Sequence, residues 1–144
     1  MSNTKFSIAQ LFLRIALAVT MFSAVADRFG FWGSNAAWGN WAAFEEYTRT
    51  LTFFLPSFLS KVGAYIATFC EIVFSILLLI GFKTKIIASA TSLLLLSFGI
   101  AMTIALGVKA PLDYSVWTST AAAFLLATQN KFSFSIDELI NKNK

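Results

Sequence analysis

The sequence predicts an all-α integral membrane protein, in which four antiparallel spanning helices form a bundle and one interfacial amphipathic helix lies between the first two spans. The composition is 58% hydrophobic and only 12% charged, with a mean hydropathy of +0.74, whereas a soluble domain carries about 25% charged residues. The apolar residues also gather in four stretches, and a helix needs about 20 of them to cross a bilayer. The length of 144 residues suits one domain over residues 1–144.

The first predicted span covers residues 8–29. Its start also fits a signal peptide, because Lys5 precedes the apolar run and residues 24–26 (Ala-Val-Ala) resemble a cleavage site. Arg14, however, lies inside the run, and the run is long for the apolar region of a signal peptide. We therefore interpret this segment as a retained membrane helix.

The predicted interfacial helix covers residues 41–55. Apolar side chains recur at helical spacing on one side of it, and the charged side chains point away from that side. Such a helix lies along a membrane surface, and tryptophan concentrates where membrane meets water. This helix and the loop before it could serve as an anchor, a lid or a partner surface, with Trp32, Trp38, Trp41 and Phe44 as the contact residues.

The other predicted spans cover residues 61–82, 86–108 and 114–128. Only a short basic turn, residues 83–85 (Lys-Thr-Lys), separates the second span from the third, so the two are expected to form an antiparallel hairpin. Four spans put both termini on one side of the membrane. Most of the lysines lie on that side, and this bias predicts that both termini are cytoplasmic.

Glu71 is the one charged residue near the centre of the second span. A charge at this depth costs about 2.5 kcal/mol or more on insertion scales, so such residues usually face protein and have a partner. We predict that Glu71 points into the bundle and that Arg14 neutralises it. This intramembrane cluster of Arg14 and Glu71 could be a structural ion pair that fixes helix register. Alternatively, it could bind a polar head such as a quinone ring, or relay protons.

A second polar cluster is expected at the outer ends of the spans. Asp27 and Arg28 close the first span, and Asp113 opens the fourth span at the same level. Together with Trp32 and Trp38 they could line a shallow outer pocket. The alternative is interfacial anchoring, in which long side chains extend to the membrane surface.

The residue inventory disfavours several classes of function. The chain has no histidine, and its single cysteine, Cys70, allows neither an internal disulfide nor a Cys-x-x-Cys pair. We therefore expect no metal site and no electron transfer by the chain alone. The basic residues are scattered, without the clustered stripe that nucleic-acid binding needs.

Several short stretches form a set through their order and spacing. They are residues 13–18 (Leu-Arg-Ile-Ala-Leu-Ala), 41–47 (Trp-Ala-Ala-Phe-Glu-Glu-Tyr), 70–72 (Cys-Glu-Ile), 77–85 (Leu-Leu-Leu-Ile-Gly-Phe-Lys-Thr-Lys), 113–114 (Asp-Tyr) and 132–139 (Phe-Ser-Phe-Ser-Ile-Asp-Glu-Leu). This set resembles the DoxX family of small four-span bacterial membrane proteins, over nearly the whole chain. Many relatives end the first span with a His-Gly-x-x-Lys-like segment, whereas residues 24–30 read Ala-Val-Ala-Asp-Arg-Phe-Gly. The histidine is absent, and Arg28 could stand for the basic residue.

The resemblance implies a multi-pass protein of the bacterial inner membrane. Some family members are membrane subunits of a thiosulfate:quinone oxidoreductase, others are linked with detoxification of oxidants and thiols, and distant relatives act in membrane assembly or trafficking. The resemblance implies a subunit that works with a membrane or periplasmic protein partner. It also implies that this subunit contacts a quinone, the one cofactor expected, or a lipid headgroup at the Arg14–Glu71 cluster. If the chain has an enzymatic role, it is as part of a quinone-linked oxidoreductase. The alternatives are a non-catalytic assembly or scaffold protein, and a small transporter or proton pathway that uses Glu71.

Overall fold

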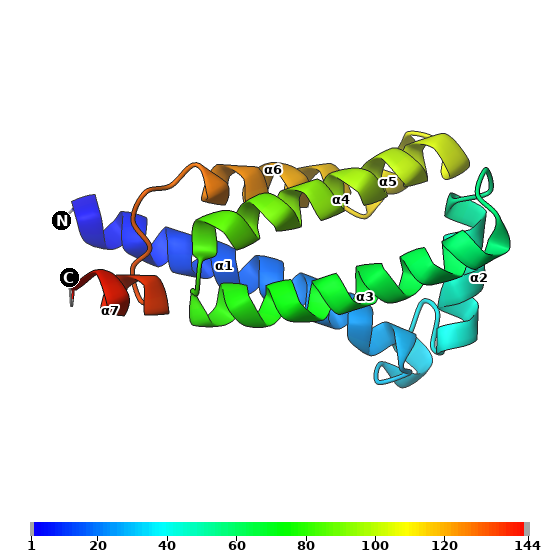
Figure 1. Cartoon of the computed structure of the whole chain (residues 1–144), viewed down its shortest axis with the longest axis horizontal. Coiled ribbons are helices and arrows are strands. Elements are labelled where there is room, and N and C mark those ends of the chain that lie inside the picture. The colour runs from blue at the N-terminus through cyan, green and yellow to red at the C-terminus, as the bar shows by residue number, and fades with distance from the viewer. Residues whose placement is uncertain (1, 143–144) are drawn as a thin grey trace.

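The structure, a computed structural model, describes residues 2–142, and the regular elements within them are helices. They are α1 (Ser2–Arg28), the 3₁₀ turn η1 (Gly33–Asn35), α2 (Trp41–Leu51), α3 (Ser57–Ile80), α4 (Thr84–Leu106), α5 (Lys109–Asp113), α6 (Val116–Ala127) and α7 (Ile136–Lys142). Figure 1 shows α1, α3 and α4 lying lengthwise, with the start of α1 and α7 at one end and α2 at the other. We call these the terminal end and the α2 end. The predicted all-helical class is confirmed.

Three of the helices are long and apolar enough to cross a membrane, namely α1 from Thr4 onward, α3 and α4. The fourth predicted span, over residues 114–128, contains a shorter helix. α6 has 12 residues, or about 18 Å at 1.5 Å per residue, which is less than the roughly 30 Å hydrocarbon layer. It begins late because Ser115 takes a left-handed conformation (φ 55°) that separates it from α5. α6 packs against α4 and α1.

A tight turn joins α3 to α4, as the short basic turn in the sequence predicts. Gly81 ends α3 in a left-handed conformation (φ 67°), and its amide donates to the carbonyl of Leu77 at 2.9 Å. The carboxylate of Asp137, from the start of α7, accepts hydrogen bonds from the amides of Lys83 and Thr84, both at 2.7 Å. The C-terminal segment therefore caps the start of α4 and holds the turn in place.

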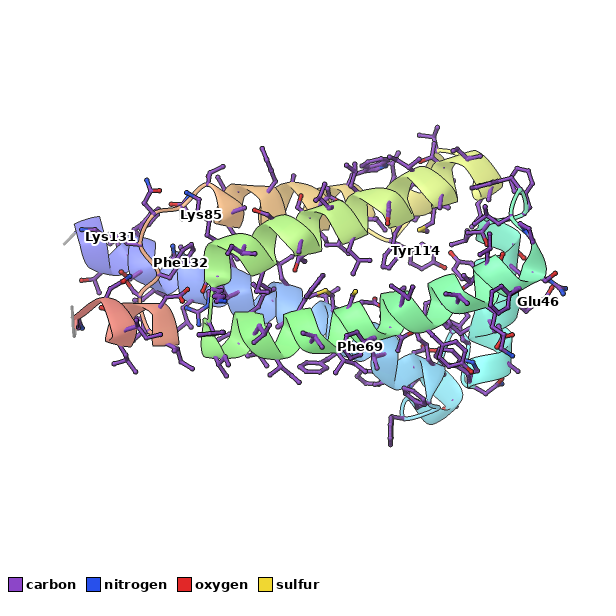
Figure 2. The ribbon with its side chains drawn as sticks, viewed as in Figure 1. Glu46, Phe69, Lys85, Tyr114, Lys131 and Phe132 are labelled. Atoms are coloured by element: carbon purple, nitrogen blue, oxygen red, sulfur yellow. The ribbon has the colours of Figure 1, made fainter. Side chains whose placement is uncertain are left out.

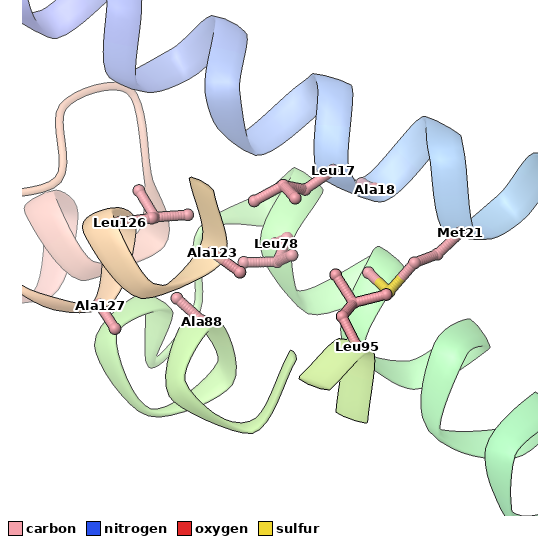
Figure 3. Packing of buried hydrophobic residues seen from close by; sticks show 9 residues of the cluster. All are labelled: Leu17, Ala18, Met21, Leu78, Ala88, Leu95, Ala123, Leu126 and Ala127. Carbon is pink, nitrogen blue, oxygen red and sulfur yellow. The ribbon is translucent and has the colours of Figure 1, made fainter. Parts of the chain in front are cut away.

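The hydrophobic core lies where α1, α3, α4 and α6 meet (Figure 3). Its buried residues are Leu17, Ala18, Met21, Leu78, Ala88, Leu95, Ala123, Leu126 and Ala127. The alanines among them let the helices approach closely, as small residues do between membrane helices. Large apolar side chains face outward instead, and Phe12, Phe69 and Leu93 are each at least two-thirds exposed. This distribution suits a protein surrounded by lipid.

α2 lies across the start of α3 (Figure 1). Asn40 begins it, since its side-chain oxygen accepts a hydrogen bond from the amide of Ala43 at 2.9 Å. The helix ends at Leu51 rather than at the predicted residue 55. The hydroxyl of Thr52 donates to Ser60 on α3 at 2.7 Å, and this contact ties the turn after α2 to the next helix. Phe44, on the predicted apolar side, is the buried residue of α2.

Candidate functional site

α3 presents a partly polar stripe to the interior of the protein. Its buried residues recur every three or four positions, at Ser60, Ala64, Thr68, Glu71, Ser75 and Leu78. Glu71 is 2% exposed, so its carboxylate is turned away from lipid, as the sequence predicts. A carboxylate at this depth needs a partner within the protein.

The partner of Glu71 is Arg28, the last residue of α1. The guanidinium donates from Nη1 to Glu71 Oε2 and to the hydroxyl of Thr68, the latter at 2.6 Å. Thr68 donates in turn to the carbonyl of Ala64 at 2.9 Å. Both charged side chains are 3% exposed. The pair therefore joins the α2-end terminus of α1 to the middle of α3 in a region without bulk water.

An aromatic cover lies over Arg28. The carbon Cζ of the guanidinium is 3.9 Å from the ring centroid of Phe44 and 5.7 Å from that of Trp38. These rings contact each other at 5.1 Å between centroids, and Trp41 contacts Phe44 at 5.6 Å. A cation over an aromatic face gains about 0.5–2 kcal/mol, more when water is excluded. Of the expected contact residues, Trp38 and Phe44 therefore cover Arg28, and Trp41 packs against Phe44.

The buried Nε donor of Arg28 is not used within residues 2–142. The Nε atom is buried and has no hydrogen-bond partner among the residues that the structure describes. A buried donor without an acceptor costs about 1–3 kcal/mol. Such a group calls for an oxygen supplied from outside the chain, by a water or a ligand.

Asp27 positions the aromatic cover. Its carboxylate accepts hydrogen bonds from the amides of Ala37, Trp38 and Gly39, at 2.7, 2.8 and 3.1 Å. These bonds fold the loop before α2 back onto the end of α1. Gly30 allows the close approach, because a Cβ there would lie 2.7 Å from the carbonyl oxygen of Gly39. Asp27 thus acts on the site through the loop that carries Trp38.

The prediction that Arg14 neutralises Glu71 is wrong. Arg14 is 0% exposed, but its guanidinium donates to four backbone carbonyls. They belong to Leu78, Leu79, Ser133 and Phe134, at 2.9 to 3.2 Å. Arg14 therefore lies level with the end of α3, about 10 Å along the helix from Glu71. There it satisfies carbonyls that the helix leaves without intrahelical partners.

The outer-end cluster is assembled only in part. Asp27 and Arg28 lie together under the loop, but Asp113 is exposed and forms its ion pair with Lys109 on α5. Trp32 also lies apart from the aromatic cover. It is 48% exposed, and its indole donates to the carbonyl of Ser23 at 3.0 Å.

Arg28 is the partner of Glu71 that the sequence analysis did not predict. A usable signal was present, because Arg14, Leu17, Met21, Val25 and Arg28 recur at three- and four-residue steps on α1. All five are buried. The periodicity places both arginines on one inner face of α1. Which of them contacts Glu71 depends on how α1 is offset along α3.

These features define a helical membrane protein with several apolar helices, a lipid environment and a buried ion pair. A sequence model of the DoxX family matches residues 9–104, so the chain belongs to the DoxX family. No curated protein and no solved structure was found to match. Within residues 2–142, no group of three or more His, Cys, Asp or Glu side chains is placed to hold a metal ion.

Proposed function

We propose that the chain is a bacterial inner-membrane subunit that binds the polar head of a membrane-soluble molecule at Arg28 and Glu71, with a quinone as the first candidate. The observation that carries the proposal is the buried Nε of Arg28, which has no acceptor among the described residues and belongs to a guanidinium covered by two aromatic rings. A ligand carbonyl would use this donor. The corrected ion pair replaces the Arg14–Glu71 cluster as the proposed binding centre.

The groups around Arg28 suit a flat head that carries carbonyl oxygens. Arg28 would donate to an oxygen, while the rings of Phe44 and Trp38 would pack against the head. A bound quinone would supply redox chemistry, and the residues here would bind it, orient it and exclude water. Because the chain has no histidine and a single cysteine, we assign electron delivery to a protein partner.

A photoreactive quinone analogue tests this site. We expect the analogue to label the peptides around Trp38 and Phe44, in competition with unmodified quinone. Phe44→Leu removes one ring and keeps the ion pair, and Glu71→Gln keeps the shape of the side chain. Each should lower labelling about tenfold, the ratio that corresponds to about 1.4 kcal/mol. Arg49→Gln, an exposed arginine on α2 that pairs with Glu46, should leave labelling unchanged. Equal labelling of all variants would overturn the proposal.

The orientation of the chain is part of this proposal. Figure 2 shows Lys85 and Lys131 at the terminal end and Glu46 at the α2 end. Positive residues favour the cytoplasmic side, so we place both termini in the cytoplasm and α2 outside. A fluorescent protein that folds only in the cytoplasm, fused after residue 144, should fluoresce. A dark fusion at normal expression would reverse the assignment.

A scaffold role is the second candidate, favoured by the exposed aromatic residues of the loop before α2. Phe31 is 80% exposed and Trp32 is 48% exposed. If a partner docks there, Phe31→Ser with Trp32→Ser should abolish its co-purification, whereas Glu71→Gln should retain it. If both variants retain the partner, docking on this loop is excluded.

A proton pathway is the third candidate, favoured by three buried hydroxyl groups. Ser75, Thr84 and Thr91 are each 0% exposed, and their hydroxyls have no hydrogen-bond partner among the described residues. Waters beside such groups could lead from the terminal end toward Glu71. Proton uptake into vesicles that contain the protein should then stop in Glu71→Gln. Unchanged uptake in that variant, or none in the parent protein, would eliminate this role.

A further inference from the structure

A groove lies between α2 and the start of α3 at the α2 end. It encloses about 220 Å³, and the residues that matter here are Trp41, Glu45, Glu46 and Arg49 from α2 with Ser57 and Lys61 from α3. Neither Arg28 nor Glu71 lines it, so it is distinct from the proposed quinone site. Its volume is below the 300–1,000 Å³ typical of sites for whole drug-sized ligands. The groove therefore suits a small polar group rather than an entire cofactor.

The walls carry both signs of charge in equal number. Lys61 Nζ lies 3.3 Å from Glu45 Oε1, and Arg49 Nη2 lies 2.7 Å from Glu46 Oε1. The four side chains are between 30% and 61% exposed, so each retains bonding capacity toward a ligand. Two anions next to two cations complement a molecule that carries both a positive and a negative group.

One wall of the groove is fixed before any ligand binds. The indole of Trp41 donates to Glu45 Oε2 at 3.1 Å, while the other carboxylate oxygen pairs with Lys61. The ring of Trp41 packs against that of Tyr65, with 4.6 Å between centroids. Glu45 is thus held in one orientation, and a ligand would lose little free energy in ordering it.

An exposed apolar strip continues from the groove along α3. Lys61, Tyr65 and Phe69 are spaced four residues apart and so share one face of the helix. Tyr65 is 52% exposed and Phe69 is 67% exposed. Since α3 is a membrane-spanning candidate that begins at Ser57, the groove lies where the span begins and the strip runs toward the hydrocarbon.

We infer that this groove binds the headgroup of a phospholipid that carries a phosphate and a primary amine. The phosphate lies between Lys61 and Arg49, and the ammonium group donates to Glu45 and Glu46. The acyl chains follow Tyr65 and Phe69. A quaternary ammonium cannot donate hydrogen bonds to the carboxylates, and a purely anionic headgroup is repelled by them. The groove therefore selects a phosphoethanolamine headgroup over phosphocholine and phosphoglycerol.

Native mass spectrometry of the full chain, released from vesicles with equal amounts of the three lipid classes, tests the inference. We expect the ethanolamine lipid to be retained preferentially by the parent protein. Glu45→Gln with Glu46→Gln should lower that preference about fivefold, because two charge-assisted contacts are lost at a partly exposed site. Lys109→Gln with Asp113→Asn removes an exposed ion pair elsewhere, on α5, and should leave the preference unchanged.

Two results would overturn the assignment. Equal retention of the three lipids by the folded parent protein, checked by its thermal unfolding, removes the headgroup selectivity. If water-soluble phosphoethanolamine displaces the lipid at equal concentration, the acyl chains contribute nothing and the lipid assignment fails. Loss of quinone labelling in Phe44→Leu has no bearing on either result, so this site and the quinone site are tested separately.

Discussion

Arg28 and Glu71 form a buried ion pair that joins the last residue of α1 to the middle of α3. The pair fixes how far α1 extends along α3, and it places the guanidinium beneath Phe44 of α2. One contact thus holds three helices in register. The desolvation of two charges offsets much of their attraction, so the pair specifies an arrangement more than it adds stability.

Separating the two charges by mutation should destabilise the protein strongly. Arg28→Met leaves Glu71 buried without a partner, and we expect a loss of about 3–5 kcal/mol in the free energy of unfolding. The double variant Arg28→Met with Glu71→Met removes both charges and should lose less than the single variant. Unfolding in mixed detergent micelles, monitored by tryptophan fluorescence, measures the free energy of unfolding of both variants.

The exposed Lys109–Asp113 pair is the control for this prediction. Lys109→Met should change stability by less than about 1 kcal/mol, because surface ion pairs contribute little. If the losses in Arg28→Met and Glu71→Met simply add in the double variant, the two residues are not energetically coupled.

Local sequence patterns predicted much of this arrangement. The Lys83-Thr84-Lys85 turn predicted the α3–α4 hairpin, and the lone charge of Glu71 in an apolar span predicted that this residue faces the interior, where it is buried. These predictions need only the length of a turn and the cost of a charge in lipid.

The partner of Glu71 could not be predicted in the same way, because it depends on the offset between two helices. If the cytoplasmic ends of the first and second spans lay at the same depth, Arg14 would lie near Glu71. In the structure α1 extends from Ser2 to Arg28, so Arg14 reaches the carbonyls at the end of α3 while Arg28 reaches Glu71. The capping of α4 by Asp137 likewise joins segments 53 or more residues apart, which no local pattern specifies.

Gly81→Ala should destabilise the α3–α4 turn by at least about 2 kcal/mol. A Cβ at this position would lie 2.4 Å from Ser135 Cβ and 2.6 Å from Arg14 Nη2, in addition to the unfavourable positive φ. Gly33→Ala is the matched control, because Gly33 also has a positive φ (55°) but a Cβ added there would contact no other part of the protein within 4 Å. It should cost only the left-handed backbone term, about 1–2 kcal/mol. Thermal unfolding in detergent compares them, and equal losses would mean that the turn shifts to admit the methyl group.

Thr68→Val and Thr91→Val should differ although both remove a buried hydroxyl from a membrane helix. Thr68 accepts a hydrogen bond from Arg28, so its loss should cost about 1–3 kcal/mol. The hydroxyl of Thr91 has no partner among the described residues, so Thr91→Val should be neutral or slightly stabilising. The unfolding titration used for Arg28→Met gives both values. A loss above about 1 kcal/mol in Thr91→Val would indicate that this hydroxyl binds a water that matters for stability.

The C-terminal helix α7 should loosen in acid because of Glu138. A hydrogen bond with Lys142, at 3.1 Å, and a second from the amide of Phe134, at 2.8 Å, lower the pKa of Glu138 below its ordinary value of 4.5. Since the folded state favours the ionised carboxylate, the stabilisation is fully present above the ordinary pKa and is lost as the pH falls through the lowered value. Hydrogen exchange of the α7 amides, corrected for the intrinsic effect of pH on exchange, should show protection near neutral pH that declines below about pH 4.5. In Glu138→Gln the protection should be lower at neutral pH and should change less with acid, whereas Asp113→Asn should behave like the parent. An acid response in Glu138→Gln as large as in the parent would assign the effect to another carboxylate.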